Sequence, residues 1–127
     1  MREILFKAKR KDNGEWVYGD FSHTPDGEVG IEYTHKFFGS GTRSRITMLV
    51  DPETVCQYTG LVDKNGKKIF EGDIVKGKDS LARDFEVYGH IEHRDGSFVI
   101  VGEFFTHYRW LDYDVEVIGN IFDGGVK

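Results

Sequence analysis

Four dipeptides of Asn or Asp followed by Gly constrain the fold of this chain more than any other feature of its sequence. Asn and Asp tolerate the left-handed backbone region and Gly has no Cβ, so each pair suits the turn of a two-residue β-hairpin. The four pairs are Asn13-Gly14, Asp26-Gly27, Asn65-Gly66 and Asp95-Gly96. Ten Phe, six Tyr and two Trp, with only two prolines, are typical of strands. The sequence therefore predicts a mainly antiparallel β fold.

The residues beside these turns have the alternating pattern of half-buried strands. Around the first turn, residues 4–11 and 15–21 alternate apolar with polar side chains, so we expect these two segments to pair. Around the fourth turn, residues 86–93 and 97–102 form a similar pair. Residues 98–101 are all apolar, which predicts a strand that is covered on both faces.

A helix signal divides these β regions. Asp51 is a suitable N-cap, Pro52 fits the first helical position and Glu53 suits the positive end of a helix, so we predict a short helix over residues 52–58. We expect an N-terminal β subdomain over residues 1–58 that ends in this helix. Residues 59–127 contain five short strands and a Gly72-Asp73 corner, which favour an SH3-like β-barrel subdomain.

The composition limits where the protein acts and what it binds. The 127 residues carry 22 acidic and 17 basic side chains, a net charge of −5, which disfavours approach to nucleic acid. Cys56 is the only cysteine, so no disulfide forms within the chain, and a free thiol suits a reducing compartment. No apolar run reaches the roughly 18 residues of a membrane span, and residues 1–11 lack the apolar core of a signal peptide. We therefore expect a cytoplasmic protein that does not bind membranes.

Two charged stripes are candidates for partner binding. Lys7, Lys9 and Lys11 share one face of the first strand, while Asp112, Asp114 and Glu116 share one face of the last. The three carboxylates extend over roughly 13 Å, too far for one metal ion to be bound by all of them. Both stripes also fit the solvated faces of surface strands. If they do bind a partner, they are suited to pair between protomers of a homo-oligomer.

Tyr108 and Trp110 offer a different kind of surface. On a strand, their rings lie on the same side and suit the stacking of nucleic-acid bases. Packing in the core is the commoner use of such rings, because each one removes on the order of 150–250 Å² from water.

The sequence contains no arrangement typical of catalysis. The five histidines lie in unrelated positions, and no cysteine accompanies them at a zinc spacing. Cys56 lies among Val55, Gln57 and Tyr58, which favours an inert buried thiol over a nucleophile. We therefore predict no catalytic residue, cofactor site or metal site.

Several segments together resemble the YopX family of phage and prophage proteins. They are residues 2–9 (REILFKAK), 14–19 (GEWVYG), 50–61 (VDPETVCQYTGL), 63–75 (DKNGKKIFEGDIV) and 115–122 (VEVIGNIF). The resemblance implies a phage or prophage origin, a two-part β fold with an SH3-like second part, and self-association. It implies no reaction and assigns no catalytic residue. Cys56 occupies a position where the family pattern has glycine.

These observations favour a non-enzymatic phage accessory protein, an oligomeric protein-interaction module in the cytoplasm of a bacterial host. A nucleic-acid-binding SH3-like module that uses the lysine stripe with Tyr108 or Trp110 is the alternative. A hydrolase that uses Asp112 and Asp114 is a third, less favoured hypothesis, because nothing in the sequence indicates the burial that tunes catalytic pKa values.

Overall fold

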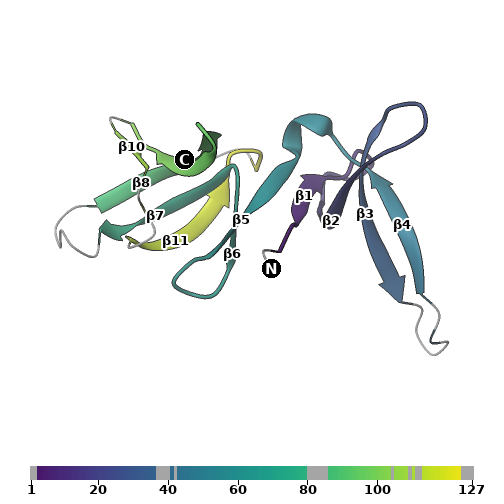
Figure 1. Cartoon of the computed structure of the whole chain (residues 1–127), viewed down its shortest axis with the longest axis horizontal. Helices are drawn as coiled ribbons and strands as arrows, with labels where there is room; N and C mark the ends of the chain where they lie inside the picture. The colour runs from purple at the N-terminus through teal and green to yellow at the C-terminus, as the bar shows by residue number, and fades with distance from the viewer. Residues whose placement is uncertain are drawn as a thin grey trace. The chain divides into compact units, whose positions relative to one another are not determined.

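The chain forms two compact units, Met1–Gln57 and Tyr58–Lys127. The computed structural model describes residues 3–36, 41, 43–79, 86–103, 105–108, 110 and 113–123. Nearly all regular structure in these residues is β-strand, as the turn dipeptides predicted (Figure 1). The strands form two antiparallel sheets, in the orders β4-β3-β2-β1-β5-β6 and β10-β9-β8-β7-β11. The predicted β class is therefore confirmed.

The first unit is built from four consecutive antiparallel strands, each paired with the next. Its elements are β1 (Phe6–Lys9), β2 (Trp16–His23), β3 (Val29–Lys36), β4 (Arg43–Leu49), the 3-10 turn η1 (Pro52–Thr54) and the start of β5 (Cys56–Val62). The predicted pairing of the first two strands is confirmed, with Lys9 opposite Trp16. Ala8, Ile31 and Val50 are fully buried and form the centre of this unit's core.

All four turn dipeptides lie in tight turns between paired strands, but only the last makes a two-residue turn. Asp95 and Gly96 both have positive φ, 52° and 82°, and they join Arg94 to its partner Ser97. This is the backbone of a type I′ turn. In the other three pairs only the glycine has positive φ. These three loops are longer than two residues, so their backbone enters the left-handed region at the glycine and not at the preceding Asn or Asp.

The predicted helix over residues 52–58 is wrong beyond its first turn. Its start signals are correct, because Asp51 caps η1 by accepting a hydrogen bond from the backbone N–H of Glu53 at 3.1 Å. From Cys56 onward the backbone is a strand, with Cys56 opposite Lys7 of β1. The side-chain hydroxyl of Thr54 meanwhile accepts from the Lys9 N–H at 2.9 Å. Pairing with β1 therefore overrides continuation of the helix.

The second unit contains a five-stranded sheet. Its strands are β7 (Asp73–Asp79), β8 (Glu86–Arg94), β9 (Ser97–Val101), β10 (Thr106–His107) and β11 (Tyr113–Asn120), and β6 (Lys68–Phe70) pairs with β5. The predicted pairing of β8 with β9 is confirmed. Val99 and Ile100 point to opposite faces of β9 and both are 0% exposed. This strand is therefore covered on both faces, as its apolar run predicted.

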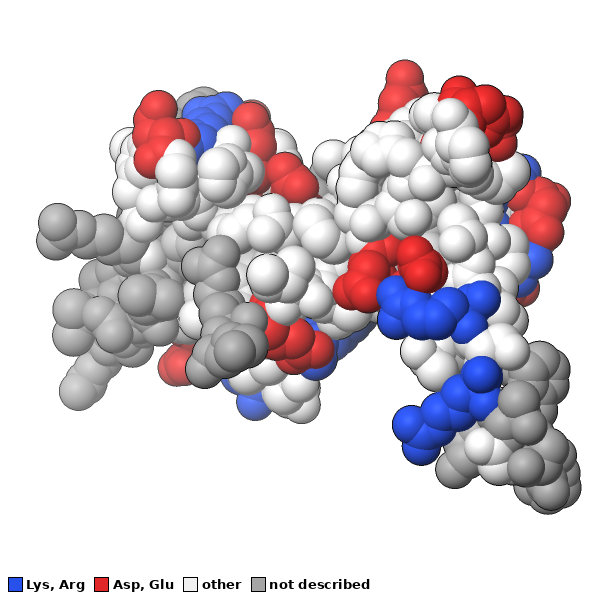
Figure 2. Space-filling view, turned by 45° about the vertical axis from the view of Figure 1, so that its right-hand side comes forward, with Lys and Arg blue, Asp and Glu red and all other residues white. Residues whose placement is uncertain are grey.

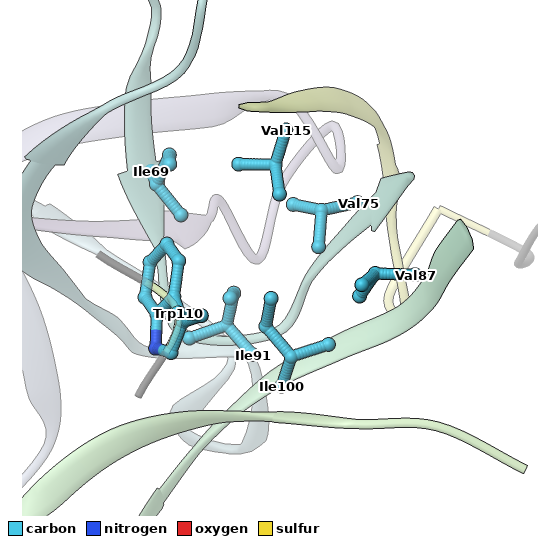
Figure 3. Packing of buried hydrophobic residues seen from close by; sticks show 7 residues of the cluster. All are labelled: Ile69, Val75, Val87, Ile91, Ile100, Trp110 and Val115. Carbon is cyan, nitrogen blue, oxygen red and sulfur yellow. The ribbon is translucent and has the colours of Figure 1, made fainter. Parts of the chain in front are cut away.

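One face of this sheet packs the core of the second unit. Seven buried residues make up this core: Ile69, Val75, Val87, Ile91, Ile100, Trp110 and Val115 (Figure 3). They come from β6, β7, β8, β9, β11 and the segment that precedes β11. Alternation along β7, β8 and β11 then directs the intervening side chains to the opposite face. We call this opposite side the outer face.

The predicted SH3-like barrel is not confirmed. Among the described strands of the second unit, β10 and β11 form the two ends of an open sheet. The backbone groups on the free side of β11 are bound by a turn. The Lys64 N–H donates to the carbonyl of Val115 at 3.0 Å, and the Asp63 carboxylate accepts from the Val117 N–H at 3.0 Å. This turn protects the edge where a barrel-closing strand would pair.

Candidate functional site

The predicted lysine stripe lies against an aromatic ring. The ammonium groups of Lys7 and Lys9 lie 4.6 Å and 5.5 Å from the centroid of the Trp16 ring, which confirms that they share a face. Such contacts are favourable cation–π interactions. Lys7 is only 6% exposed, whereas Lys11 is exposed in the turn after β1. Of the three lysines, Lys11 therefore offers its charge to solvent most fully.

The two predicted stacking residues have different surroundings. Trp110 is 4% exposed, and its indole N–H donates to the carbonyl of Phe98 at 2.8 Å. Its ring lies among the core side chains (Figure 3). Tyr108 is 56% exposed. The structure thus places Trp110 in the core and leaves only Tyr108 with an open ring.

The predicted acidic stripe is described in part. Asp112 lies outside the described residues. Asp114 is exposed on β11, and Glu116 is half-buried and accepts from the side-chain amide of Asn65 at 3.3 Å. Strand register places Lys78 opposite Asp114 and Lys76 opposite Glu116. The neighbours of these acids are therefore lysines of the adjacent strand, which the sequence reading did not single out.

The outer face of the second unit's sheet carries a groove of about 750 Å³. Two rows of residues cross β11, β7 and β8 in it. One row is Glu116, Lys76 and Tyr88, and the other is Asp114, Lys78 and Glu86. Lys64 lies beyond β11 and completes the charged lining. We call this surface, defined by these seven residues, the charged groove.

The charged groove contains equal numbers of lysines and carboxylates. Opposite charges on adjacent strands attract each other across the sheet. Among the residues that the structure describes, no ion pair within 4.0 Å engages Lys76 or Lys78. Figure 2 shows acidic and basic side chains next to one another at several places on the face that it presents. A mixed surface of this kind suits a protein partner better than a polyanion.

A signal for the charged groove was present in the sequence. Lys76 and Lys78 alternate with Val75 and Gly77, the pattern of a half-buried strand. Which carboxylates lie beside them depends on the pairing of β7 with β11, whose residues are more than 30 positions away along the chain. The sequence pattern identifies the lysines as surface residues but does not supply that pairing.

Asp63 holds the turn beside the charged groove. Its carboxylate accepts from the backbone N–H groups of Asn65 and Lys67, both at 2.9 Å, and from that of Val117 at 3.0 Å. Burial raises the pKa of Asp63, but these three hydrogen bonds outweigh it, so the pKa lies below the ordinary 3.8. Asp63 therefore anchors the turn to β11 as a carboxylate.

Asp73 has a comparable structural role at the corner before β7. Its side chain is buried and accepts from the backbone N–H of Phe70 at 2.8 Å and from the Asn120 amide at 2.9 Å. The Asn120 oxygen in turn accepts from the Phe122 N–H at 2.9 Å. This network joins two segments of the sequence, 63–75 and 115–122, through hydrogen bonds within the fold.

Cys56 is buried at the start of β5. Its thiol lies 3.2 Å from the carbonyl of Thr54, to which it donates. The expected buried thiol is therefore observed. Among the described residues, no group of three or more His, Cys, Asp or Glu side chains is placed to hold a metal ion. The described part of the chain also contains no helix long and apolar enough to span a bilayer.

Comparison with known proteins identifies the family. None of the curated proteins matches the chain. A family model described as YopX protein matches residues 5–125, which include both units almost completely. The segments that suggested this family, including the turn held by Asp63 and the corner held by Asp73, all overlap the matched range. The chain therefore belongs to the YopX protein family.

Proposed function

We propose that this chain is a non-enzymatic, oligomeric protein-interaction module, an accessory protein of phage or prophage origin. We place its action in the cytoplasm of the bacterial host. Membership of the YopX family supports the phage origin. The proposed activity is contact with other protein chains, including further copies of this one.

The charged groove is the observation that carries this proposal. The groove has a volume of about 750 Å³ and lies on the outer face of a regular sheet. Lysines and carboxylates alternate from strand to strand along its floor. Charges fixed in this way on a sheet select a partner whose own charges are complementary and repel others. Tyr88 adds an exposed aromatic ring, a residue type that is enriched at protein interfaces.

The roles of the buried acids support the non-enzymatic part of the proposal. Asp63 and Asp73 accept hydrogen bonds from backbone N–H groups, which keeps them in structural roles. The pKa of Asp63 is lowered, whereas a carboxyl that acts as a general acid at neutral pH needs a raised pKa. The segments typical of the family are thus used to build the turn and the corner.

A pull-down from phage-infected cells tests the proposal. Tagged wild-type protein is the bait, and the lysate is divided into nuclease-treated and untreated halves. We expect the same captured proteins in both halves. We also expect their loss from a bait that carries Lys76→Glu and Lys78→Glu, because these changes make every charge of the groove acidic except Lys64.

Two results would contradict the proposal. Capture that disappears in the nuclease-treated half would show that nucleic acid mediates the contact. Equal capture by the wild-type bait and by the Lys76→Glu, Lys78→Glu bait would exclude the charged groove as the contact surface. Circular dichroism of both baits verifies that the substitutions leave the fold intact.

One observation favours nucleic-acid binding as a second candidate, namely the exposed ring of Tyr108. Two other members of that predicted interface, Lys7 and Trp110, are buried and therefore less available. Fluorescence anisotropy with single- and double-stranded oligonucleotides at low salt tests this candidate. Binding that weakens steeply as salt rises would support it, since counterions are released from phosphates.

A further inference from the structure

The charges of the groove are arranged in columns along the strands. Register places two carboxylates on β11, Asp114 and Glu116, directly beside two lysines on β7, Lys78 and Lys76. Glu86 on β8 lies beside Lys78 on the other side. Lys64 flanks the free edge of β11, because its N–H binds the Val115 carbonyl. From Lys64 across to β8 the columns therefore read positive, negative, positive, negative.

This alternation is complementary to itself. Adjacent strands lie about 4.8 Å apart, so the columns are nearly evenly spaced. Suppose that a second copy faces this surface and is related to the first by a two-fold axis that runs parallel to the strands, midway between β7 and β11. This axis places the β7 column of each copy over the β11 column of the other. The same axis exchanges the Lys64 position with the β8 column. Each positive column of one copy then lies over a negative column of the other.

We propose that the charged groove is the contact surface between two copies of this chain. The two copies pack the outer faces of their second-unit sheets against each other with strands aligned, a common arrangement of stacked sheets. Lys76 of one copy lies over Glu116 of the other, Lys78 lies over Asp114, and Glu86 lies over Lys64. This proposal rests on the self-association in the proposed function and names the surface responsible.

The charge balance of the face favours a second copy as the occupant. The whole chain has a net charge of −5, so two copies repel each other through most orientations. The charged groove has three lysines and three carboxylates, so repulsion is lowest where two such faces meet. A contact that depends on exposed ion pairs is weak and is screened by salt. We therefore expect a dimer at low ionic strength that dissociates as salt is raised.

Charge reversal followed by mixing tests this dimer. Sedimentation equilibrium at low salt should give the wild-type chain about twice its monomer mass of 14.6 kDa. The Lys76→Glu, Lys78→Glu variant and the Asp114→Lys, Glu116→Lys variant should each give the monomer mass, because like charges then face each other. An equimolar mixture of the two variants should recover the doubled mass.

The mixture separates specific pairing from general attraction. Both variants remain net negative, because four units of added positive charge do not offset −5. Recovery in the mixture therefore requires the columns to match. The control variant Asn13→Asp with Arg43→Glu and Ser44→Glu lowers the net charge by four units, as much as the first variant does, at exposed positions of the first unit. It should keep the doubled mass.

Three results would overturn the dimer: a monomeric wild-type chain at low salt, no recovery in the mixture, or dissociation of the control variant. The pull-down described above tests the proposed interaction function independently of the dimer. A monomeric wild-type chain that still captures a nuclease-resistant partner overturns the dimer and leaves the interaction function standing. A dimer that captures no partner supports the dimer and contradicts the accessory role.

Discussion

The side chain of Asp63 attaches a turn of the second unit to β11. A single carboxylate receives three backbone N–H groups, two from its own turn and one from β11. The segment that contains Asp63 was recognised from its sequence pattern, and an Asn-Gly turn there was predicted. The hydrogen bond to Val117 was not predicted, because it joins residues 54 positions apart.

Replacing Asp63 with Asn should destabilise the fold. The amide nitrogen of Asn cannot accept a hydrogen bond, so at least one buried N–H loses its partner. Hydrogen bonds to charged groups contribute about 1.5–3 kcal/mol, and we expect a loss in that range. Urea unfolding measures it as a lower midpoint with an unchanged slope. Asp95→Asn is the control, because Asn tolerates the positive φ of that exposed position.

The same carboxylate should make stability depend on pH. The pKa of Asp63 is lower in the folded chain than its ordinary value of 3.8, so the folded state binds this proton more weakly than the unfolded state. Its contribution is therefore complete above the ordinary pKa and is lost as pH falls through the folded pKa. The difference in unfolding free energy between wild type and Asp63→Asn should shrink below about pH 4. A constant difference down to pH 2 would contradict this assignment.

At the scale of elements, backbone approach between β7 and β11 positions the charged groove. Gly77 lies between Lys76 and Lys78, and an added Cβ there would lie 2.0 Å from the Asp114 carbonyl oxygen and 2.7 Å from the Val115 Cα. Both neighbours are backbone atoms, so neither can rotate away. The absence of a side chain at residue 77 is what lets the lysine and carboxylate columns lie side by side.

Gly77→Ala should therefore separate β7 from β11. Overpacking of this kind costs about 1–3 kcal/mol, and we expect a lower thermal midpoint together with loss of self-association. Gly66→Asn is the comparison, because nothing lies within 4 Å of its added Cβ, so any loss of stability there comes from its φ of +82° alone. Asn is among the side chains that best accept positive φ, so this loss should be the smaller one. A Gly77→Ala variant with wild-type stability would show that the close approach is not required.

At the scale of the whole molecule, the described residues form a hydrophobic core in each unit. One is centred on Ala8, Ile31 and Val50 in the first unit, and the other includes Ile100 and Trp110 in the second. Each core is built by strands of its own unit. Truncating a core residue should therefore reduce the local stability of the unit that contains it more than that of the other unit.

Ile100→Ala and Ile31→Ala form a matched pair for this test. Both side chains are 0% exposed, and such truncations cost about 2–5 kcal/mol. Hydrogen exchange read by mass spectrometry should show faster exchange in residues 58–127 for Ile100→Ala and in residues 1–57 for Ile31→Ala. Equal acceleration in both units by either variant would indicate one cooperative core instead.

The local structure could be predicted from the amino-acid sequence alone. The Asx-Gly turns, the alternating strands beside them and the doubly covered strand β9 follow from backbone preferences and side-chain periodicity, which act between neighbours along the chain. The helix prediction failed from Cys56 onward because pairing with β1 competes with local signals. The barrel prediction relied on strand order, whereas Asp63 and Lys64 bind the edge of β11 instead.

Which charged side chains lie beside one another depends on the pairing of strands that are distant in the sequence. Lys7 and Lys9 read as an exposed stripe, yet they lie over Trp16, because β1 pairs with β2 in that register. Asp114 and Glu116 read as an isolated acidic face, yet lysines of β7 lie beside them. A periodic pattern fixes the face to which a side chain points, but its neighbours across a sheet come from strand pairing between distant residues. The charged groove was therefore visible only in the folded chain.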